Sequence, residues 1–306
     1  MKAKRVRSRR VLGFVLSVAV TWAAGCSLFQ SDDTADITDV HETYTDIQPY
    51  PVTVDGVVIE ESPLKIVSLS PVLTEILFEF GYGDRLIGRS RYCDYPTGVN
   101  AIKQVKSGSE FDVAQIIGIS PDLLLLSAPI TDKDRVELQR AGVATVVIAA
   151  PRTIEEFRNI YDTFGVILYG AFLGKEKGES AFSGITQACN NPYVLDLGNY
   201  IYVTENLSVA TGDTLESAIL SRFGYNLASN GNGYVFDLAY LTEHQPDVVL
   251  INEAIGLDKV KKHEVFSRLD AVAQGRVIVI NNAYFERPSS RMIELIDYIR
   301  IQHRTL

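Results

Sequence analysis

The sequence predicts an α/β protein of two Rossmann-like lobes, each with a central parallel sheet, bridged by a long helical segment. Short apolar runs alternate with helical stretches from residue 64 to about residue 150. The alternation stops over a long helical run and resumes near residue 200. Continuous apolar strands between helices are typical of parallel sheets covered on both faces, so we expect one such sheet on each side of the helical run.

The amino terminus has the pattern of an export signal. Residues 1–10 contain six basic residues and no acidic residue, and an apolar run over residues 11–24 follows. The run falls short of the roughly 20 residues that a membrane-spanning helix needs, and it ends at Ala23-Ala24-Gly25-Cys26. This ending resembles the bacterial lipoprotein box. We expect residues 1–25 to be a lipoprotein signal peptide and Cys26 to carry the lipid; the alternative is an ordinary signal peptide and a chance cysteine.

Removal of this segment leaves a strongly acidic chain. The whole sequence has 29 basic and 38 acidic residues, and loss of the six basic residues leaves 23 against 38, a formal charge of −15. Nucleic acid is disfavoured as a partner, because its binding needs a basic surface. The charge suits a soluble monomer at the extracytoplasmic face of the cell membrane, repelled from anionic lipid and held there by its own lipid anchor.

The elements of the first half follow in order. Residues 26–48 are acidic and polar, and we expect them to form a flexible tether. An N-terminal lobe over residues 49–152 opens with a β-hairpin, because Asp55-Gly56 separates two β-branched runs. Its strands are expected at 66–69, 86–88, 123–126 and 145–148, and its helices at 71–80, 113–119 and 133–141.

The second half begins with a capping box of Thr153 and Glu156, which opens a bridging helical segment over residues 153–190. Gly165, Gly170 and Gly174 predict a bend or break within it. A C-terminal lobe over residues 191–306 follows. Its strands are expected at 200–204, 248–251 and 277–280, and its last helix at 289–302.

An internal repeat links the two lobes. Phe-Asp-Val-Ala at 111–114 precedes a Pro-Asp pair at 121–122, and Phe-Asp-Leu-Ala at 236–239 precedes a second pair at 246–247. In both copies the first Asp lies nine residues before the Pro. We expect each first Asp to cap a helix and each Pro-Asp pair to lie between that helix and the next strand.

Several stretches together resemble a known family. They are residues 65–71 (Lys-Ile-Val-Ser-Leu-Ser-Pro), 74–77, 91–96, 119–124 and 283–288, with Arg291. From about Leu64 to Ile299 the chain is similar to the helical-backbone binding proteins for iron-siderophores and vitamin B12, the class III periplasmic binding proteins. The Tyr-x-Asp-Tyr-Pro and Phe-Glu-Arg stretches are most similar to the cobalamin-binding members.

The resemblance implies a solute held between the lobes, in the loops beyond the carboxyl ends of the strands. The implied ligand contacts are Ser70, Tyr92, Ser107, Tyr234, Tyr284, Phe285 and Arg287. The alternatives are that Tyr92 packs its own loop, that Tyr234 anchors its own loop, and that Arg287 pairs with Glu286 or Glu294. Two ring-stacking Trp positions of the B12 binders correspond to Gly108 and to the segment 231–234.

The family also implies docking to an ABC importer. Each lobe of its members presents a Glu to arginines of the permease, but the corresponding residues here are Ala114 and Ala239. Glu110, Asp112 and Asp237 are nearby acids that could substitute. Our first hypothesis is that the protein is the solute-binding lipoprotein of an ABC importer. Its ligand would be a corrinoid, iron-siderophore or haem chelate, and we expect it to use no cofactor of its own. The alternative is a surface lipoprotein of the same fold that senses or scavenges without docking.

An enzyme on a two-lobed fold is the third and weakest hypothesis. The sequence lacks the motifs G-x-S-x-G, H-E-x-x-H, C-x-x-C and the P-loop. Its four histidines, at 41, 244, 263 and 303, are scattered and predict no metal site. Cys93 and Cys189 could form a disulfide or remain two inert thiols, and both readings stay open.

Overall fold

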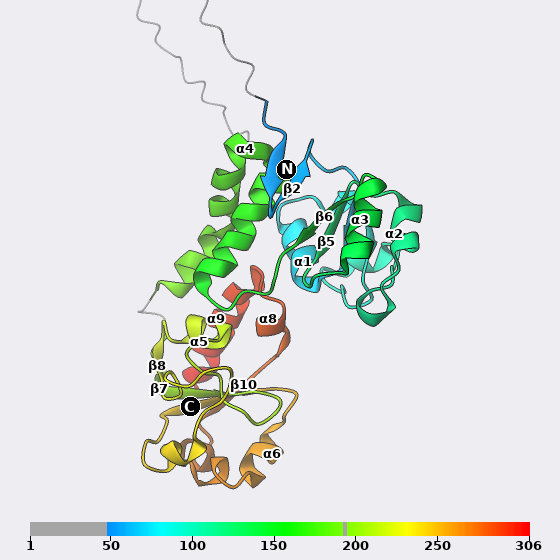
Figure 1. The fold of residues 1–306 in the computed structure, drawn as a ribbon. Helices are drawn as coiled ribbons and strands as arrows, with labels where there is room; N and C mark the ends of the chain where they lie inside the picture. The colour runs from blue at the N-terminus through cyan, green and yellow to red at the C-terminus, as the bar shows by residue number, and fades with distance from the viewer. Residues whose placement is uncertain (1–47, 192–194) are drawn as a thin grey trace, which may run out of the picture. The chain divides into compact units, whose positions relative to one another are not determined.

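The computed structural model describes residues 48–191 and 195–306 (Figure 1). The predicted signal peptide, the lipidation site Cys26 and nearly all of the predicted tether lie outside the described residues. Within the described part of the chain, no helix has the length and apolar character needed to cross a membrane.

The first lobe is built on a four-stranded parallel sheet in the order β4-β3-β5-β6. Its strands are β3 (Ile66–Ser68), β4 (Leu86–Arg89), β5 (Leu123–Leu126) and β6 (Ala144–Val147). All four leucines of β5 are buried, as expected for a central strand with both faces covered. Helix α1 (Pro71–Glu79) follows β3 directly, with Pro71 in the first helical turn, where its missing N–H costs no hydrogen bond.

The second lobe repeats this topology. Its parallel sheet has the order β10-β9-β7-β8, formed by β7 (Gly198–Val203), β8 (Gly224–Asn226), β9 (Val248–Asn252) and β10 (Val277–Ile280). Numbered by appearance within each lobe, both sheets have the strand order 2-1-3-4. The predicted fold class of two parallel-sheet lobes is therefore confirmed, and β8 is a strand that the sequence patterns did not indicate.

The remaining elements complete the lobes. The helices are α2 (Val113–Ile119), α3 (Asp132–Arg140), α5 (Leu215–Leu220), α6 (Leu257–Lys262), α7 (Asp270–Ala273), α8 (Ala283–Glu286) and α9 (Arg291–His303). Single turns of 3-10 helix are η1 (Gly83–Arg85), η2 (Thr97–Ala101), η3 (Gly108–Glu110), η4 (Leu238–Thr242) and η5 (Phe266–Arg268). The predicted hairpin is present as antiparallel β1 (Val52–Val54) and β2 (Val57–Ile59).

The bridging segment is α4 (Ile154–Cys189), which is a hairpin of two helices rather than one straight rod. The chain reverses at Gly170, whose φ of 78° and ψ of −174° are accessible to glycine and strained for other residues. A Cβ on Gly165 would lie 1.9 Å from the carbonyl oxygen of Gly174, so the two backbones touch. Farther along, the rings of Phe157 and Phe182 pack edge to face at 5.1 Å.

The carboxyl end of the first α4 helix is capped by side chains from the first lobe. Tyr50 donates its hydroxyl to the carbonyl of Ile167 at 2.9 Å, and Tyr82 donates to the carbonyl of Leu168 at 3.0 Å. The last carbonyls of a helix have no partner within it, so these bonds satisfy groups that the break at Gly170 would leave unpaired. The reversal is thus fixed by residues far away in the sequence.

The internal repeat predicted from the Phe-Asp and Pro-Asp motifs is present. Asp112 caps α2 by accepting the N–H of Gln115, and Asp237 accepts the N–H of Ala239 at the start of η4. Asp122 accepts the N–H of Lys65 just before β3, and Asp247 accepts the N–H of Asn199 in β7. Each Pro-Asp pair therefore ties the start of one central strand to its neighbour.

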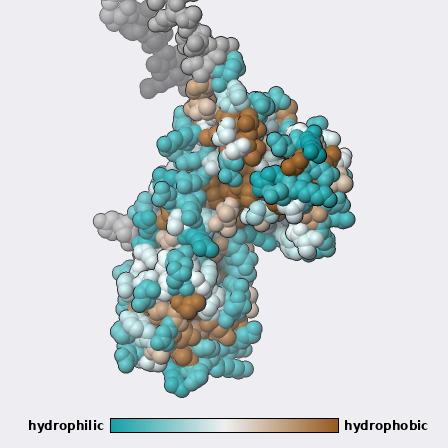
Figure 2. All heavy atoms as spheres, in the orientation of Figure 1, coloured by the Kyte–Doolittle hydropathy of each residue, from teal (hydrophilic) through white to brown (hydrophobic). Residues whose placement is uncertain are grey.

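A buried polar contact joins the two lobes. Glu75 of α1 is 2% exposed and accepts hydrogen bonds from Ser289 at 2.7 Å and from Arg291 at 3.5 Å, both at the start of α9. Burial raises the pKa of the Glu75 carboxyl. Hydrophobic residues of both lobes and of α4 form one core around this contact, and in Figure 2 hydrophobic residues gather where α4 meets the first lobe.

Candidate functional site

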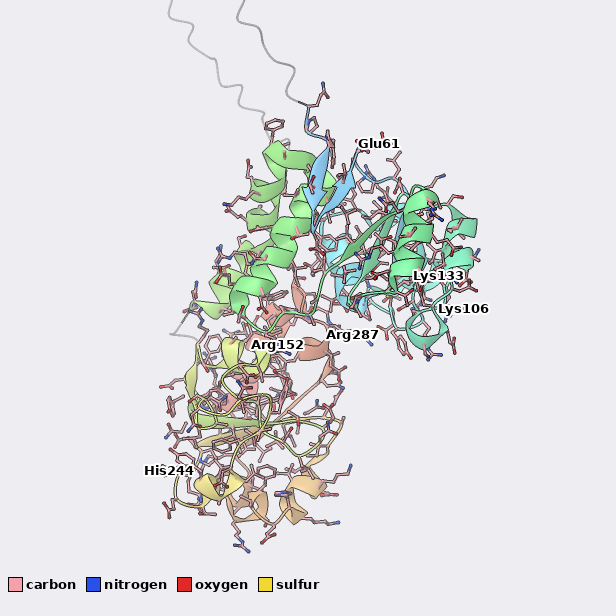
Figure 3. The ribbon with its side chains drawn as sticks, in the orientation of Figure 1. Glu61, Lys106, Lys133, Arg152, His244 and Arg287 are labelled. Atoms are coloured by element: carbon pink, nitrogen blue, oxygen red, sulfur yellow. The ribbon has the colours of Figure 1, made fainter. Side chains whose placement is uncertain are left out.

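The second lobe contains a cavity of about 930 Å³ at the carboxyl ends of its strands. Its wall includes Thr204 and Glu205 after β7 and Asn252 at the end of β9. In the strand order 2-1-3-4, β7 and β9 are the neighbours whose following segments diverge, which is the point where open α/β sheets bind ligands. Arg152, labelled in Figure 3, completes the wall from the segment that precedes α4.

The cavity wall is acidic and rich in amides. Its carboxylates are Glu205, Asp213, Glu216 and Glu286, and its side-chain amides are Asn206, Asn232, Asn252 and Asn282. Among the described residues, Arg152 is the one cationic side chain in the wall. The wall therefore offers many hydrogen-bond acceptors and an excess of negative charge.

Neighbouring donors hold these carboxylates in place. Asn252 donates to Glu205 at 3.1 Å, and Asn282 donates to Glu286 at 3.0 Å. Hydrogen bonds from the hydroxyl of Thr211 and from the N–H of Gly233 lower the pKa of Asp213. The acceptors are thus oriented before any ligand arrives, which reduces the entropy lost on binding.

Burial raises the pKa of Glu216, another carboxyl group of the cavity wall. It lies in the first turn of α5 and accepts a hydrogen bond from the hydroxyl of Tyr234 at 3.2 Å. Burial also raises the pKa of Tyr234, and the adjacent Glu216 carboxylate adds to this effect. The raised pKa of Tyr234 keeps its phenol protonated, so the hydroxyl remains able to donate to Glu216.

Aromatic rings form the apolar part of the wall. Phe285 of α8 is buried and packs edge to face on Tyr202 of β7, with ring centres 5.3 Å apart. Tyr234 is 40% exposed and has a positive φ of 64°, in the loop between β8 and η4. Sequence analysis placed Tyr234 and Phe285 in the site, and both line this cavity.

The corresponding place in the first lobe is filled instead of hollow. Ser68 at the end of β3 accepts a hydrogen bond from Thr74 at 2.8 Å, and Thr74 also contacts the Cys93 thiol at 3.2 Å. Ser90 bonds the same thiol at 3.1 Å. These four side chains are buried, so small polar groups fill the space between the carboxyl end of β3 and helix α1.

The first-lobe residues predicted to contact ligand lie apart from the cavity. Tyr92 is largely exposed, and Arg91 donates to its hydroxyl at 2.6 Å while stacking over its ring. Ser70 is buried at the start of α1. Ser107 lines a small hollow of about 170 Å³ together with Arg91 and Glu110. Ligand contact by Ser70, Tyr92 and Ser107 stays a prediction.

Arg287 was predicted to bind ligand or to pair with Glu286 or Glu294, and neither pairing is present. It forms an ion pair with Asp94 of the first lobe instead, 193 residues away in the sequence. Tyr284 packs against Arg291 and, within the described chain, is not part of the cavity wall. Both residues lie at the contact between the lobes, and a ligand-binding role for them stays a prediction.

Two of the three acids proposed for docking have local partners. Asp112 caps α2 and lies 3.6 Å from the ammonium of Lys106, and Asp237 caps η4. Glu110 is exposed in η3. Ala114 and Ala239 are also exposed, so the positions that carry Glu in the resembling family are on the surface here.

A second cavity, of about 550 Å³, lies beside the β1–β2 hairpin. Its wall includes Asp122 and the segment 142–145, which precede β5 and begin β6, so it lies at the amino ends of the strands. Ligand sites of parallel sheets lie at the opposite edge. We therefore assign the candidate site to the larger cavity.

Two other predicted features concern metals and cysteines. In the part of the chain that the structure describes, no group of His, Cys, Asp and Glu is arranged to hold a metal ion. Cys93 and Cys189 are both buried free thiols, so the reading with two separate thiols holds in this structure. Burial raises the pKa of Cys189 to about 11, which keeps its thiol protonated.

Sequence analysis missed Arg152, Tyr202 and Glu216 as parts of the site. Tyr202 lies inside an apolar strand pattern, and Glu216 is an ordinary acid in the first turn of a helix. The one usable signal was position, because Arg152 and Glu216 both follow the carboxyl end of a strand.

Comparisons with known proteins show what the chain as a whole is similar to. Residues 66–188 match the family model described as periplasmic binding protein. The uncharacterized ABC transporter substrate-binding lipoprotein YvrC of Bacillus subtilis is 25% identical over 95% of this chain and 96% of its own length. A cobalamin-binding protein of Halobacterium salinarum is 22% identical over 94% of this chain and 82% of its own length.

A solved structure supports the fold. The periplasmic haem-binding protein HutB of Vibrio cholerae superposes with a TM-score of 0.65 at 17% identity, covering 78% of this chain and 98% of its own. At this identity the likeness bears on the fold, which has the two lobes described above. The matched model covers residues 66–188 and the two relatives span nearly the whole chain, so this chain is similar to periplasmic and ABC-transporter substrate-binding proteins.

Proposed function

We propose that this protein is the extracytoplasmic solute-binding lipoprotein of an ABC importer and that it carries a metal chelate in the cavity of its second lobe. The observation that carries the proposal is the cavity of about 930 Å³ at the switch point between β7 and β9, with acceptors already oriented. Ligand pockets of drug-sized molecules have about this volume. The fold and the named relatives are those of solute-binding proteins, and we infer that the chain catalyses no reaction.

Among chelates, the wall favours a corrinoid over haem or an anionic siderophore. The periphery of a corrinoid carries carboxamides, whose N–H groups can donate to Glu205, Asp213 and Glu286. Haem carries two propionates, and many siderophores are anionic. Two like charges about 4 Å apart repel by roughly 1 to 4 kcal/mol near a protein surface, and Arg152 alone offsets them.

The site residues of the proposal are ranked by their place in the structure. Tyr234 and Phe285 offer ring faces for the flat macrocycle, and Glu216 fixes the Tyr234 hydroxyl. Tyr92, Ser70, Ser107, Tyr284 and Arg287 are second in rank, as groups that would reach the ligand from the first lobe and from the contact between the lobes.

Titration of the purified body, residues 49–306, tests the ligand class. Cyanocobalamin, a ferric hydroxamate and haem are added separately, and visible absorbance and tyrosine fluorescence are followed. We expect saturable binding of cyanocobalamin and at least tenfold weaker binding of haem, a difference of about 1.4 kcal/mol. Unchanged spectra with all three at high micromolar concentration would contradict the chelate proposal.

A second function has one specific observation in its favour. Ala114 and Ala239 are exposed where the resembling importer proteins present Glu, so the protein could bind its solute at the surface without docking. Deletion of the gene separates the two functions. Loss of labelled-ligand uptake supports import, whereas normal uptake together with lost surface binding supports sensing or scavenging. The import function includes both the lipid at Cys26 and a permease partner. The sensing or scavenging function includes the lipid alone.

A further inference from the structure

The tip of the α4 hairpin, residues 169–175, exposes two large apolar side chains. Phe172 is 53% exposed and Leu173 is 50% exposed, and they lie next to each other in the first turn after the break at Gly170. Single exposed apolar residues are ordinary on protein surfaces. Phe172 and Leu173 are adjacent and form an apolar surface at the tip of the helical hairpin. Packing of the fold does not require either side chain at this exposed position.

The described chain begins at this same tip. The N–H of Ala171 donates to the carbonyl of Pro49 at 2.9 Å, and Figure 1 shows the turn of the α4 hairpin beside the start of the described chain. The proposed lipidation site Cys26 precedes residue 48 by 22 residues (48 − 26). That many residues span at most about 75 Å when fully extended. The covalent link therefore keeps the tip within about that distance of the proposed lipid on Cys26.

The charges at the tip suit a phospholipid surface better than the rest of the body does. Lys175 has a largely exposed side chain whose ammonium lies 4.0 Å from the exposed Glu179 carboxylate, and the ammonium of Lys177 lies 5.8 Å from the centre of the Tyr169 ring. The amino end of the second α4 helix is also at the tip, and its dipole favours nearby phosphate groups. Lysines beside Phe and Leu are typical of segments that lie in the membrane interface.

We propose that the hairpin tip rests in the headgroup layer of the anchoring membrane, with Phe172 and Leu173 inserted below the phosphates. The proposal rests on the lipid anchor of the proposed function. The lipid retains the protein at the membrane, and the short span to Cys26 gives the tip a high effective concentration there. The tip then sets the orientation of the body, which a single attachment point would leave free to rotate.

Tryptophan fluorescence tests this contact. The sequence has one Trp, Trp22, which lies in the predicted signal, so Phe172→Trp would place a single Trp in the processed lipoprotein. The lipidated protein is reconstituted into vesicles of phosphatidylglycerol and phosphatidylethanolamine, with and without brominated acyl chains. We expect brominated lipid to reduce the emission of Phe172→Trp by about half, since bromine quenches on contact and the tip lies at the acyl boundary.

The matched control is Tyr225→Trp, because Tyr225 is 60% exposed in β8 of the second lobe. Its emission should not change with brominated lipid. A double variant, Phe172→Trp with Leu173→Ser, removes one apolar contact and should show weaker quenching than Phe172→Trp alone. Equal quenching at 172 and 225, or none at 172, overturns the proposal, as does a Leu173→Ser change that leaves the quenching intact.

The same samples separate this inference from the proposed function. The tip is not part of the cavity wall among the described residues, so ligand affinity should be the same in every Trp variant. Normal ligand binding with no quenching at 172 removes the membrane contact alone. Quenching at 172 with no ligand binding by the wild type removes the chelate proposal alone.

Discussion

The two lobes have the same strand order but differ at the place where ligands bind. In the first lobe Ser68, Thr74, Ser90 and Cys93 bond one another and fill the space between the carboxyl end of β3 and helix α1. In the second lobe the carboxyl ends of the strands border a cavity of about 930 Å³. Because Lys65 and Asn199 receive equivalent Asp bonds, Ser68 and Tyr202 occupy equivalent positions. The same sheet topology therefore places a possible ligand site in both lobes, and a few side chains determine whether a cavity forms there.

The largest expected effect is on stability and concerns the α4 helical hairpin that bridges the two lobes. In Gly165→Ala the new methyl would overlap the backbone of Gly174, which cannot move without separating the two helices. We expect the free energy of unfolding in urea to fall by about 3 kcal/mol or more. Gly118→Ala is the control, since its Cβ meets nothing within 4 Å and should stabilise α2 by up to about 1 kcal/mol. Similar stabilities for the two variants would contradict the close helix contact.

Substitutions among the buried polar residues of the first lobe should lower the free energy of unfolding and leave ligand affinity unchanged. Thr74→Val keeps the shape but removes a hydroxyl that bonds Ser68 and contacts Cys93. We expect a loss of about 1 to 3 kcal/mol in the free energy of unfolding, since buried polar groups lose a partner. Ligand affinity, measured by titration calorimetry, should stay the same. A large loss of affinity would show that residues of the first lobe contribute to ligand binding.

Substitutions in the cavity wall of the second lobe should lower ligand affinity and leave stability nearly unchanged. Tyr234→Ala removes an aromatic ring from the cavity wall at a half-exposed position, so we expect affinity to fall about tenfold, or 1.4 kcal/mol, with little change in melting temperature. Tyr225→Ala removes an exposed tyrosine that does not line the cavity and serves as the control. Equal affinities for the two variants would place the ligand elsewhere.

The smallest expected effect is a pH dependence at the contact between the lobes. Burial raises the pKa of Glu75 above its unfolded value, so the native state binds its proton more tightly than the unfolded state does. The stability that this provides is present at low pH and is lost as the pH rises through the raised pKa. Relative to Glu75→Gln, the melting temperature of the wild type should therefore fall between pH 4 and pH 7. A difference that grows in favour of the wild type would mean that the Arg291 pair outweighs burial.

Local patterns were enough to predict most of the fold. The run of four leucines in β5 predicts a strand covered on both faces, and Asp55-Gly56 predicts the turn between β1 and β2. Thr153 accepts the N–H of Glu156 as the capping box requires, and one of the three marked glycines, Gly170, breaks α4. Strand β8 was missed because Gly-Tyr-Asn is short and polar and is defined by its pairing with β7.

The candidate site was harder to predict because its contacts join residues distant in the sequence. The ion pair of Arg287 with Asp94 has no local signature, so the nearer Glu286 and Glu294 were the natural candidates. Tyr234 and Phe285 were placed by resemblance and not by any periodicity. Nothing in the sequence distinguishes filled space at the carboxyl end of a strand from a cavity there, since that depends on how side chains from several elements pack.

A crystal structure of the protein saturated with the chelate that titrates is the most direct test of the central claim. We expect the macrocycle to lie at the carboxyl ends of β7 and β9, against Tyr234 and Phe285, with carboxamides near Glu205 and Asp213. Ligand density beside the β1–β2 hairpin, or a second-lobe cavity that stays free of ligand at saturation, would contradict the account.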